Sequence, residues 1–344
     1  MKKKRLLFAT ICFLCVCAIG CTKEEKNVDS VKKQSNKETK VDKVKRADGT
    51  SGAWIAYWDI ENVIEEVSKV SEYGDYISLF EVYFDGDENL QVPEKLDEIY
   101  GQLKNQYPDK KMYISITNDF VFNDGSQSLK DKFRLKNILT DSQKSEALCD
   151  SVIEIANRYE CQGIELDFET VWKDAELVSS YVDFVRRLQQ KTNLSIRVLI
   201  EPSTSTKCLK FPNNVEYGVM CYNLHYKAEA PGPKCDYAFL KKLIKTFSKT
   251  KNPMTFALAT GGFDFGKTDR TSLTQEQAEA LAAQYNAEVV RDDKSGSLTF
   301  TYSIDNEKHE VWYADIDTIK EWIKIVQERG NYGVWIWKLG GNRF

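Results

Sequence analysis

The chain has 344 residues, of which 42% are hydrophobic, and its formal net charge at pH 7 is -4. This length and composition are typical of a globular chain with one large domain or two small ones. The small net charge argues against nucleic acid as a partner. The only two histidines are His225 and His309, so neither a zinc centre nor a Ser-His-Asp triad is expected, and no metal or cofactor is assigned.

The N-terminal segment has the features of an export signal. Lys2–Arg5 is basic, and Leu6–Ile19 is an apolar run too short to span a membrane comfortably. Small residues then lead to Cys21, and the whole segment resembles a bacterial lipoprotein signal in which Cys21 is lipidated. We therefore expect residues 1–21 to be the signal, and the mature protein to be extracytoplasmic and anchored in the bacterial cell membrane. Ordinary secretion after cleavage at Gly20 is the alternative.

Residues 22–50 are rich in charged and small polar side chains and contain hardly any large apolar residue. Such a segment cannot bury enough surface to offset its ordering entropy, so we expect a disordered tether. A flexible chain of about 29 residues has a root-mean-square span of roughly 30 Å, enough to hold a folded domain just off a membrane.

The cysteines predict no disulfide framework. Three leave with the expected signal, and Cys21 would carry the lipid. The remaining cysteines form an odd, scattered set without metal-ligand spacing: Cys149, Cys161, Cys208, Cys221 and Cys235.

From residue 51 onwards, strand-like and helix-like segments alternate. The strand-like runs are short and rich in β-branched and aromatic residues, and apolar positions with helical spacing lie between them. We expect eight strands, at residues 53–58, 76–84, 111–117, 162–169, 194–200, 217–224, 254–260 and 333–339. Eight strands alternating with helices predict an α/β fold, a (β/α)8 TIM barrel over residues 51–344.

The chain between the last two expected strands is too long for a simple loop. Residues 273–285 follow a helical pattern, and residues 292–296 have the composition of a turn between two alternating strands. A second helical pattern over residues 316–326 leads into the final strand. We therefore expect a small α+β insertion at about residues 265–315, between strands seven and eight.

The strand expected at residues 162–169 places Glu165, Asp167 and Glu169 on one face and apolar side chains on the other. For an isolated pattern of this kind, a solvated acidic face is the alternative. Helical patterns on both sides indicate a parallel sheet whose two faces are covered. Carboxylates on a covered face are destabilising unless neighbours compensate for them. In a barrel that face is the interior, and Glu169 would lie at the strand end that opens into the active site.

This stretch resembles the D-G-x-D-x-D-x-E signature of glycoside hydrolase family 18, the chitinase-like enzymes. The resemblance implies that Glu169 is the general acid/base and that Asp167 orients the acetamido group of the substrate. Glu165 stands where the family has its inner Asp, and is expected to contribute to substrate binding. Gln162 stands at the first Asp of the signature. Both residues depart from the pattern. Glu165 has a longer side chain than Asp, and Gln162 lacks the charge of Asp at a position far from the chemistry.

Further segments resemble the spore-cortex and germination-type members of this family, and the likeness covers about residues 53–341. The matching implies that Tyr222 hydrogen-bonds the acetamido carbonyl and that Trp337 forms the floor of the sugar pocket. A purely structural role for Trp337 is the alternative. Asn118 and Asn223 are also assigned to substrate binding. Two further positions depart from the family: Asn223 replaces an Asp, and Gly261 replaces an aromatic residue.

The resemblance implies a surface-anchored, monomeric hydrolase of β-linked N-acetylglucosaminides, with peptidoglycan, chitin and N-glycans as the possible polymers. The lipid anchor and the spore-type likeness favour peptidoglycan. Family 18 is among the substrate-assisted exceptions to retaining glycosidases with a carboxylate nucleophile. Two alternatives remain: a catalytically inactive barrel that acts as a carbohydrate-binding lipoprotein, and a solute-delivery lipoprotein, which would need two lobes and a hinge.

Overall fold

The computed structural model describes residues 49–58, 63–226, 230–267 and 269–343. The expected signal at residues 1–21, with Cys21, and all but the last two residues of the expected tether lie outside the described residues. Within the described part of the chain, no helix is both long enough and apolar enough to cross a membrane.

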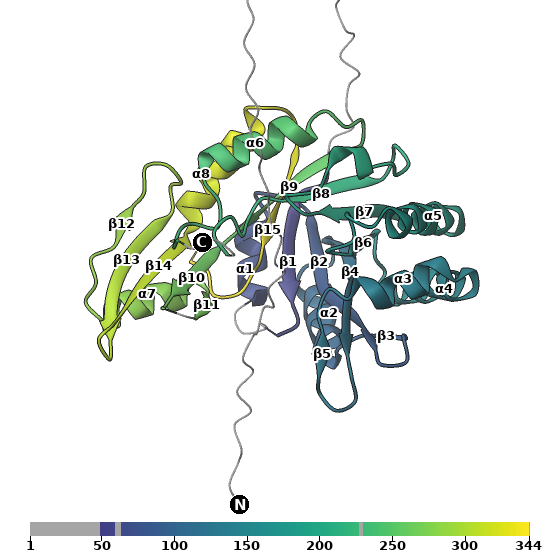
Figure 1. Cartoon of the computed structure of the whole chain (residues 1–344), viewed down its shortest axis with the longest axis horizontal. Coiled ribbons are helices and arrows are strands. Elements are labelled where there is room, and N and C mark those ends of the chain that lie inside the picture. The colour runs from purple at the N-terminus through teal and green to yellow at the C-terminus, as the bar shows by residue number, and fades with distance from the viewer. Residues whose placement is uncertain (1–48, 59–62, 227–229, 268, 344) are drawn as a thin grey trace, which may run out of the picture. The chain divides into compact units, whose positions relative to one another are not determined.

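Eight parallel strands close into a barrel (Figure 1). Each strand pairs with its neighbours in a continuous ladder that returns to β1 through pairings of β1 with β2 and β15, and of β2 with β4. The barrel strands are β1 (Gly52–Ala56), β2 (Tyr76–Asp85), β4 (Lys111–Val121), β6 (Gly163–Asp167), β7 (Ser195–Ile200), β8 (Glu216–Met220), β9 (Met254–Ala259) and β15 (Gly333–Trp337). The predicted (β/α)8 TIM barrel is confirmed.

Helices follow most of the strands and cover the barrel. They are α1 (Val63–Val70), α2 (Glu94–Gln106), α3 (Lys132–Thr140), α4 (Ser142–Arg158), α5 (Ala175–Lys191), α6 (Tyr237–Phe247) and α8 (Ile316–Gln327). Between β7 and β8 stands the short 3-10 helix η1 (Thr206–Cys208). An aspartate accepts backbone N–H bonds at the start of five of these helices, which explains where they begin: Asp131, Asp141, Asp174, Asp236 and Asp315.

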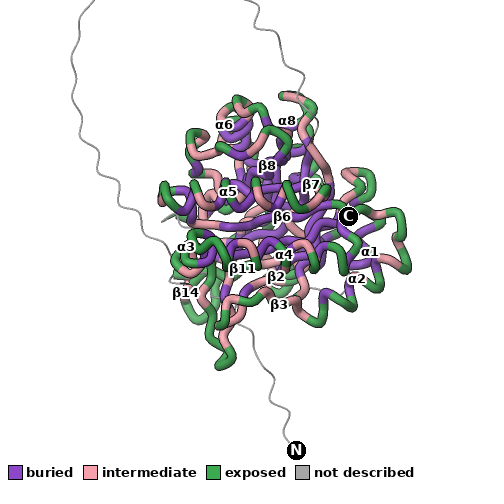
Figure 2. Tube along the Cα trace, turned by 90° about the vertical axis from the view of Figure 1, so that its right-hand side faces the viewer, coloured by how far each residue is buried: buried purple, intermediate pink, exposed green. Residues whose placement is uncertain are grey.

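The core has two main layers. The larger layer lies between the strands and the helices and contains Ile164, Leu166 and Phe168. The smaller layer fills the barrel interior with Trp54, Trp335 and their neighbours. In Figure 2 the strands are accordingly drawn as buried, while the outward sides of the helices are exposed. Side chains of β6 therefore alternate between the two layers, as the sequence predicts.

The insertion between β9 and β15 is confirmed and is larger than predicted. It forms a five-stranded antiparallel sheet in the order β11-β10-β14-β13-β12, beside which Figure 1 shows α7. Its elements are β10 (Gly261–Phe265), β11 (Arg270–Leu273), α7 (Gln275–Gln284), β12 (Val290–Arg291), β13 (Leu298–Ile304) and β14 (Glu307–Ala314). The sequence pattern predicts only two strands here; it misses β10 because this strand begins one residue after β9 with Gly261 and Gly262, a pair that is typical of a strand end.

Three strand ends differ from the prediction and move site residues. β6 ends at Asp167, so Glu169 lies two residues beyond the strand. β4 runs on to Val121 and pairs there with β5 (Gln127–Ser128), so Asn118 lies inside the strand rather than after it. β8 ends at Met220, so Tyr222 and Asn223 lie in the loop that follows. Asn223 has a φ of 64°, a left-handed conformation that no extended strand accommodates. A short strand β3 (Leu90–Gln91) pairs with the end of β2.

Candidate active site

Asp167 and Glu169 lie at the C-terminal end of β6, on the side of the strand that faces the barrel interior. Asp167 is the last residue of the strand and is buried, with 8% of its surface exposed. The side chain of Glu169 is 18% exposed. Phe168, between them, packs in the opposite direction against Tyr181 of α5, with ring centroids 5.0 Å apart. The structure therefore brings the two predicted carboxyl groups together at the barrel mouth.

Asn118 of β4 holds the backbone of Glu169. The Glu169 N–H donates to Oδ1 of Asn118 (2.9 Å), and Nδ2 of Asn118 donates to the Glu169 carbonyl (3.1 Å). Asn118 is 1% exposed, so both ends of its amide are used within the protein. This differs from the substrate-binding role expected from the sequence: the structure gives Asn118 a positioning role at the catalytic candidate.

Lys130, which the sequence reasoning missed, forms an ion pair with Glu169. Its Nζ lies 2.5 Å from Oε1 of Glu169. Burial acts to lower the pKa of Lys130, but the carboxyl groups of Glu169, Asp167 and Asp119 outweigh burial, and its pKa is raised. Lys130 belongs to the segment between β5 and α3, where no strand or helix periodicity marks a site residue.

Asp167 is surrounded by carboxyl groups. Desolvation raises the pKa of Asp167 well above its ordinary value, repulsion from Glu169 and Glu165 acts in the same direction, and Lys130 opposes them. Its Oδ1 atom is buried and has no hydrogen-bond partner among the described residues. A protonated or hydrogen-bonded Asp167 is therefore favoured, and Oδ1 is available to a donor on a ligand.

A second acidic pair, Glu81 of β2 and Asp119 of β4, lies near Glu169 and was not singled out from the sequence as a site. Desolvation, followed by repulsion from Asp119, raises the pKa of Glu81 to about 8. Desolvation also raises the pKa of Asp119 to about 6, against the backbone N–H of Lys130 that donates to it. The barrel mouth thus holds carboxyl groups from three neighbouring strands.

Glu165 lies deeper in the barrel and is fully buried. The strand register puts Glu165 of β6 beside Arg197 of β7, whose Nη2 forms an ion pair with Oε2 of Glu165. The other carboxylate oxygen accepts from Nε1 of Trp54 (2.6 Å) and Oγ of Ser78 (3.0 Å). Glu165 therefore differs from its expected substrate-binding role: with no exposed surface, it supports the floor of the site from below.

Gln162 lies at the opposite end of β6 from the candidate acid. Its side chain accepts from the backbone N–H of Met112 (2.7 Å) and donates to the carbonyl of Glu160 (2.9 Å). The substitution of a family Asp by Gln162 is therefore far from the carboxylates, as the sequence predicts, because β6 separates the two positions.

Tyr222 follows β8 and packs partly buried against the aromatic interior layer. Burial raises the pKa of its hydroxyl well above the ordinary value, and the nearby carboxyl groups of Asp167 and Glu169 add to this. Tyr222 therefore keeps its proton and can donate a hydrogen bond into the same space as Asp167. Asn223, the next residue, is exposed and has a left-handed backbone conformation.

Aromatic rings line the barrel mouth opposite the carboxylates. Trp337, the last residue of β15, meets Trp54 at 5.9 Å and Phe80 at 4.7 Å between ring centroids. Trp58, which the sequence reasoning did not single out, meets Phe80 at 5.8 Å and is 44% exposed. An exposed tryptophan beside a partly exposed one offers faces on which a sugar ring can stack.

Gly261 is a glycine for a steric reason. Its φ is 61°, and a Cβ atom added there would lie 2.3 Å from the carbonyl oxygen of Leu273. Any larger residue at this position would push β10 away from β11, because the two strands pair next to it. The departure from the aromatic residue of the family thus follows from the sharp turn into the insertion sheet.

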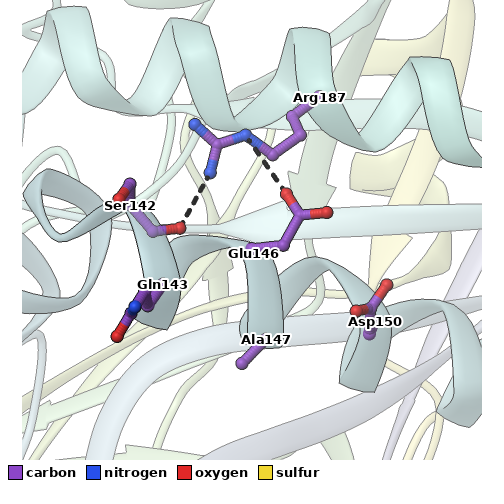
Figure 3. A pocket seen from close by; sticks show the side chains of 6 residues that line it. All are labelled: Ser142, Gln143, Glu146, Ala147, Asp150 and Arg187. Carbon is purple, nitrogen blue, oxygen red and sulfur yellow. Dashed lines mark hydrogen bonds and ion pairs between the residues drawn. The ribbon is translucent and has the colours of Figure 1, made fainter.

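A surface depression between α4 and α5 contains none of these residues. It is lined by Ser142, Gln143, Glu146, Ala147, Asp150 and Arg187. Figure 3 shows Arg187 from α5 reaching across to α4, where it pairs with Glu146 at 3.6 Å. The depression lies on the outside of the barrel, away from the strand ends that carry Asp167 and Glu169. Over the described ranges, no group of side chains has the composition of a metal site.

An eight-stranded barrel with a buried aspartate and a partly exposed glutamate at the end of one strand defines a barrel glycosidase. The sequence over residues 32–342 matches the model of Glycosyl hydrolases family 18. The chain belongs to this family and is a chitinase-like glycosidase, consistent with a substrate that contains N-acetylglucosaminides.

Similar proteins agree with this assignment. The chain is 23% identical over 302 residues to the "Cortical fragment-lytic enzyme" of Bacillus subtilis, covering 81% of this chain and 68% of the relative. The spore cortex-lytic enzyme SleL of Bacillus cereus has a similar fold (TM-score 0.72, 20% identity, 86% of this chain and 72% of that one). A chitinase from Chromobacterium violaceum also does (TM-score 0.69, 17% identity, 86% and 96%).

Proposed function

We propose that this chain hydrolyses β-linked N-acetylglucosaminides with retention, by a substrate-assisted mechanism in which Glu169 is the general acid and then the general base. The observation that carries the proposal is the pair formed by Asp167 and Glu169 at the end of β6. Oδ1 of Asp167 is buried and has no hydrogen-bond partner among the described residues, so it can accept a hydrogen bond from a ligand. Retention of both residues argues against the alternative of an inactive carbohydrate-binding barrel.

In the first step, the acetamido oxygen of the substrate attacks the anomeric carbon. The bond to the leaving oxygen breaks, its electron pair goes to that oxygen, and the leaving oxygen takes the proton of Glu169. The product is a cyclic oxazolinium ion. Asp167 holds the acetamido N–H and stabilises the positive charge, while the Tyr222 hydroxyl orients the acetamido oxygen.

In the second step, water attacks the anomeric carbon. The carboxylate of Glu169 takes a proton from this water, and the oxazolinium ring opens to restore the acetamido group. No other carboxyl group of the signature stands free to attack the sugar, because Glu165 is buried and paired with Arg197. Within the signature this supports a nucleophile that comes from the substrate.

A matched pair of aryl glycosides tests this mechanism. The two substrates differ only at carbon 2, where one carries an acetamido group and the other a hydroxyl. We expect turnover of the acetamido substrate alone, and inhibition by a thiazoline analogue of the cyclised intermediate, because an enzyme binds species that resemble its transition state more tightly than substrate. Equal turnover of both substrates without thiazoline inhibition contradicts the mechanism.

The proposed polymer is peptidoglycan, and the proposed location is the outer face of the bacterial cell membrane. Similarity to a cortical fragment-lytic enzyme supports the polymer, and the sequence of residues 1–21 supports the location. Digestion of purified peptidoglycan, chitin and N-glycans, with mass spectrometry of the products, distinguishes the three polymers. Release of N-acetylglucosamine-ended fragments from chitin alone contradicts the choice of peptidoglycan.

Lipidation of Cys21 is tested by the variant Cys21→Ala. We expect the variant to remain uncleaved or to move from the detergent phase to the soluble fraction. A fully processed variant that stays in the membrane fraction shows that Cys21 is not the anchor. Size-exclusion chromatography with light scattering on the protein lacking residues 1–21 tests the expected monomer.

A further inference from the structure

Lys130 is placed beside Glu169 by its backbone as well as by its charge. Its N–H donates to Oδ1 of Asp119 (2.6 Å), and its carbonyl accepts from Oγ1 of Thr170 (3.0 Å). Its φ is 56°, a left-handed conformation that is uncommon outside glycine and that surrounding contacts must hold. Specific contacts therefore hold the backbone of Lys130 where its ammonium group lies 2.5 Å from Oε1 of Glu169.

Lys130 and Glu169 share one backbone frame. Asn118 binds the Glu169 backbone through two hydrogen bonds, and its own carbonyl accepts from the N–H of Asp131 (2.9 Å). Thr170, next to Glu169, is bonded to Lys130 on one side and donates its N–H to Glu201 on the other (2.8 Å). The frame holds the two backbone positions from which the side chains of Lys130 and Glu169 meet.

The other acidic groups around Lys130 compete weakly for its charge. They are Glu81 of β2, Asp119 of β4 and Asp167 of β6. The hydroxyl of Tyr222, after β8, lies near the carboxyl groups of Asp167 and Glu169. Burial raises the pKa of Glu81 to about 8 and that of Asp119 to about 6, and it raises the pKa of Asp167 as well. Glu169 alone among the described carboxyl groups forms an ion pair with Lys130, so the positive charge acts mainly on Glu169.

We propose that Lys130 is a positioning residue that stabilises the carboxylate form of Glu169, and so sets the pH above which the enzyme loses its protonated acid. This inference rests on the proposed function, in which Glu169 alternates between acid and carboxylate. The ammonium group favours the carboxylate that remains after the proton has moved to the leaving oxygen. It also makes the acid form scarcer as the pH rises.

The test compares the pH dependence of kcat/KM for the wild type with that of Lys130→Met, Lys130→Arg and Lys132→Met. Lys132 is a matched control, because it carries the same charge two residues away and contacts the ring of Phe133 rather than Glu169. We expect Lys130→Met to move the alkaline limb upward by about one pH unit, the lower end of the effect of a nearby opposite charge. Lys130→Arg and Lys132→Met should keep the wild-type limb. An unmoved limb in Lys130→Met overturns the proposal.

A second readout does not need turnover. In protein labelled with 13C at glutamate carboxyl carbons, the signal of Glu169 is assigned by its loss in Glu169→Gln, and its titration is followed by NMR. We expect the titration midpoint to rise in Lys130→Met and in Lys130→Gln, and an unchanged midpoint in either folded variant overturns the proposal. If the wild type hydrolyses no N-acetylglucosaminide, the proposed function fails, and this titration still decides the role of Lys130.

Discussion

The ion pair between Arg197 and Glu165 gives a quantitative prediction about folding stability. Neither side chain has exposed surface, and the guanidinium group also lies 3.4 Å from the ring centroid of Trp335. The variant Arg197→Met keeps most of the apolar volume but leaves Glu165 with only its two neutral donors, Trp54 and Ser78. Removing one partner of a buried ion pair destabilises a protein by about 3–5 kcal/mol, and we expect the free energy of unfolding to fall by this amount.

The double variant Arg197→Met/Glu165→Gln separates the unpaired charge of Glu165 from the other losses, which are packing and the contact of Arg197 Nη1 with Glu216 (3.5 Å). Because glutamine is nearly isosteric and neutral, the double variant should regain more than half of the lost free energy, about 2 kcal/mol or more. Urea unfolding of the protein from residue 46 onwards, followed by far-UV circular dichroism, measures both values. The control Lys104→Met removes a lysine paired with Glu160 at an exposed site, and should leave the midpoint unchanged. An Arg197→Met variant as stable as the wild type refutes the reasoning. A double variant no more stable than Arg197→Met also refutes it.

Two further changes test the residues around the acid. Because the pKa of Glu81 is about 8 in the folded protein and its ordinary value is 4.5, the folded state binds a proton that the unfolded state has lost, and stability falls as the pH rises between these values. Glu81→Gln should therefore flatten the decline of Tm between about pH 5 and pH 9, and an equal slope in both proteins contradicts this. Asn118→Ala removes two hydrogen bonds from the backbone of Glu169, and should lower kcat by about tenfold with little change in KM. Unchanged kcat in a folded variant would mean that Asn118 does not position the acid.

Features that follow a fixed period along the chain can be predicted from the sequence. The alternation along β6 predicts both the buried face and the position of Asp167 and Glu169, because a strand has only two faces and a parallel sheet covers both. The same reasoning predicts the barrel, since each βα unit has its own periodic signal. The helical and strand patterns of the insertion predict its presence but not the five-stranded sheet, whose first strand begins directly after β9.

Contacts between segments that are distant in the sequence could not be predicted from it. Lys130 and Glu169 are brought together by a loop after β5, and neither hydrophobic period nor spacing marks that lysine. The family resemblance assigns Asn118 to the substrate, at the end of the third expected strand, whereas β4 continues past Asn118 and its amide bonds the backbone of Glu169. The match of Glu165 to the inner Asp of the family signature predicts a substrate contact, and only the register with Arg197 on β7 reveals an internal partner.

The measurement that most directly tests the central claim is the turnover of an unactivated N-acetylglucosamine oligomer by the wild type and by Glu169→Gln. The amide is nearly isosteric with the carboxyl group but cannot protonate the leaving oxygen, and general acid–base catalysis contributes roughly 10²–10⁴-fold to rate. We expect wild-type turnover and a loss of at least a hundredfold in the variant, with identical circular dichroism spectra. A folded Glu169→Gln variant that retains more than about a tenth of the wild-type rate contradicts the assignment of Glu169 as the acid.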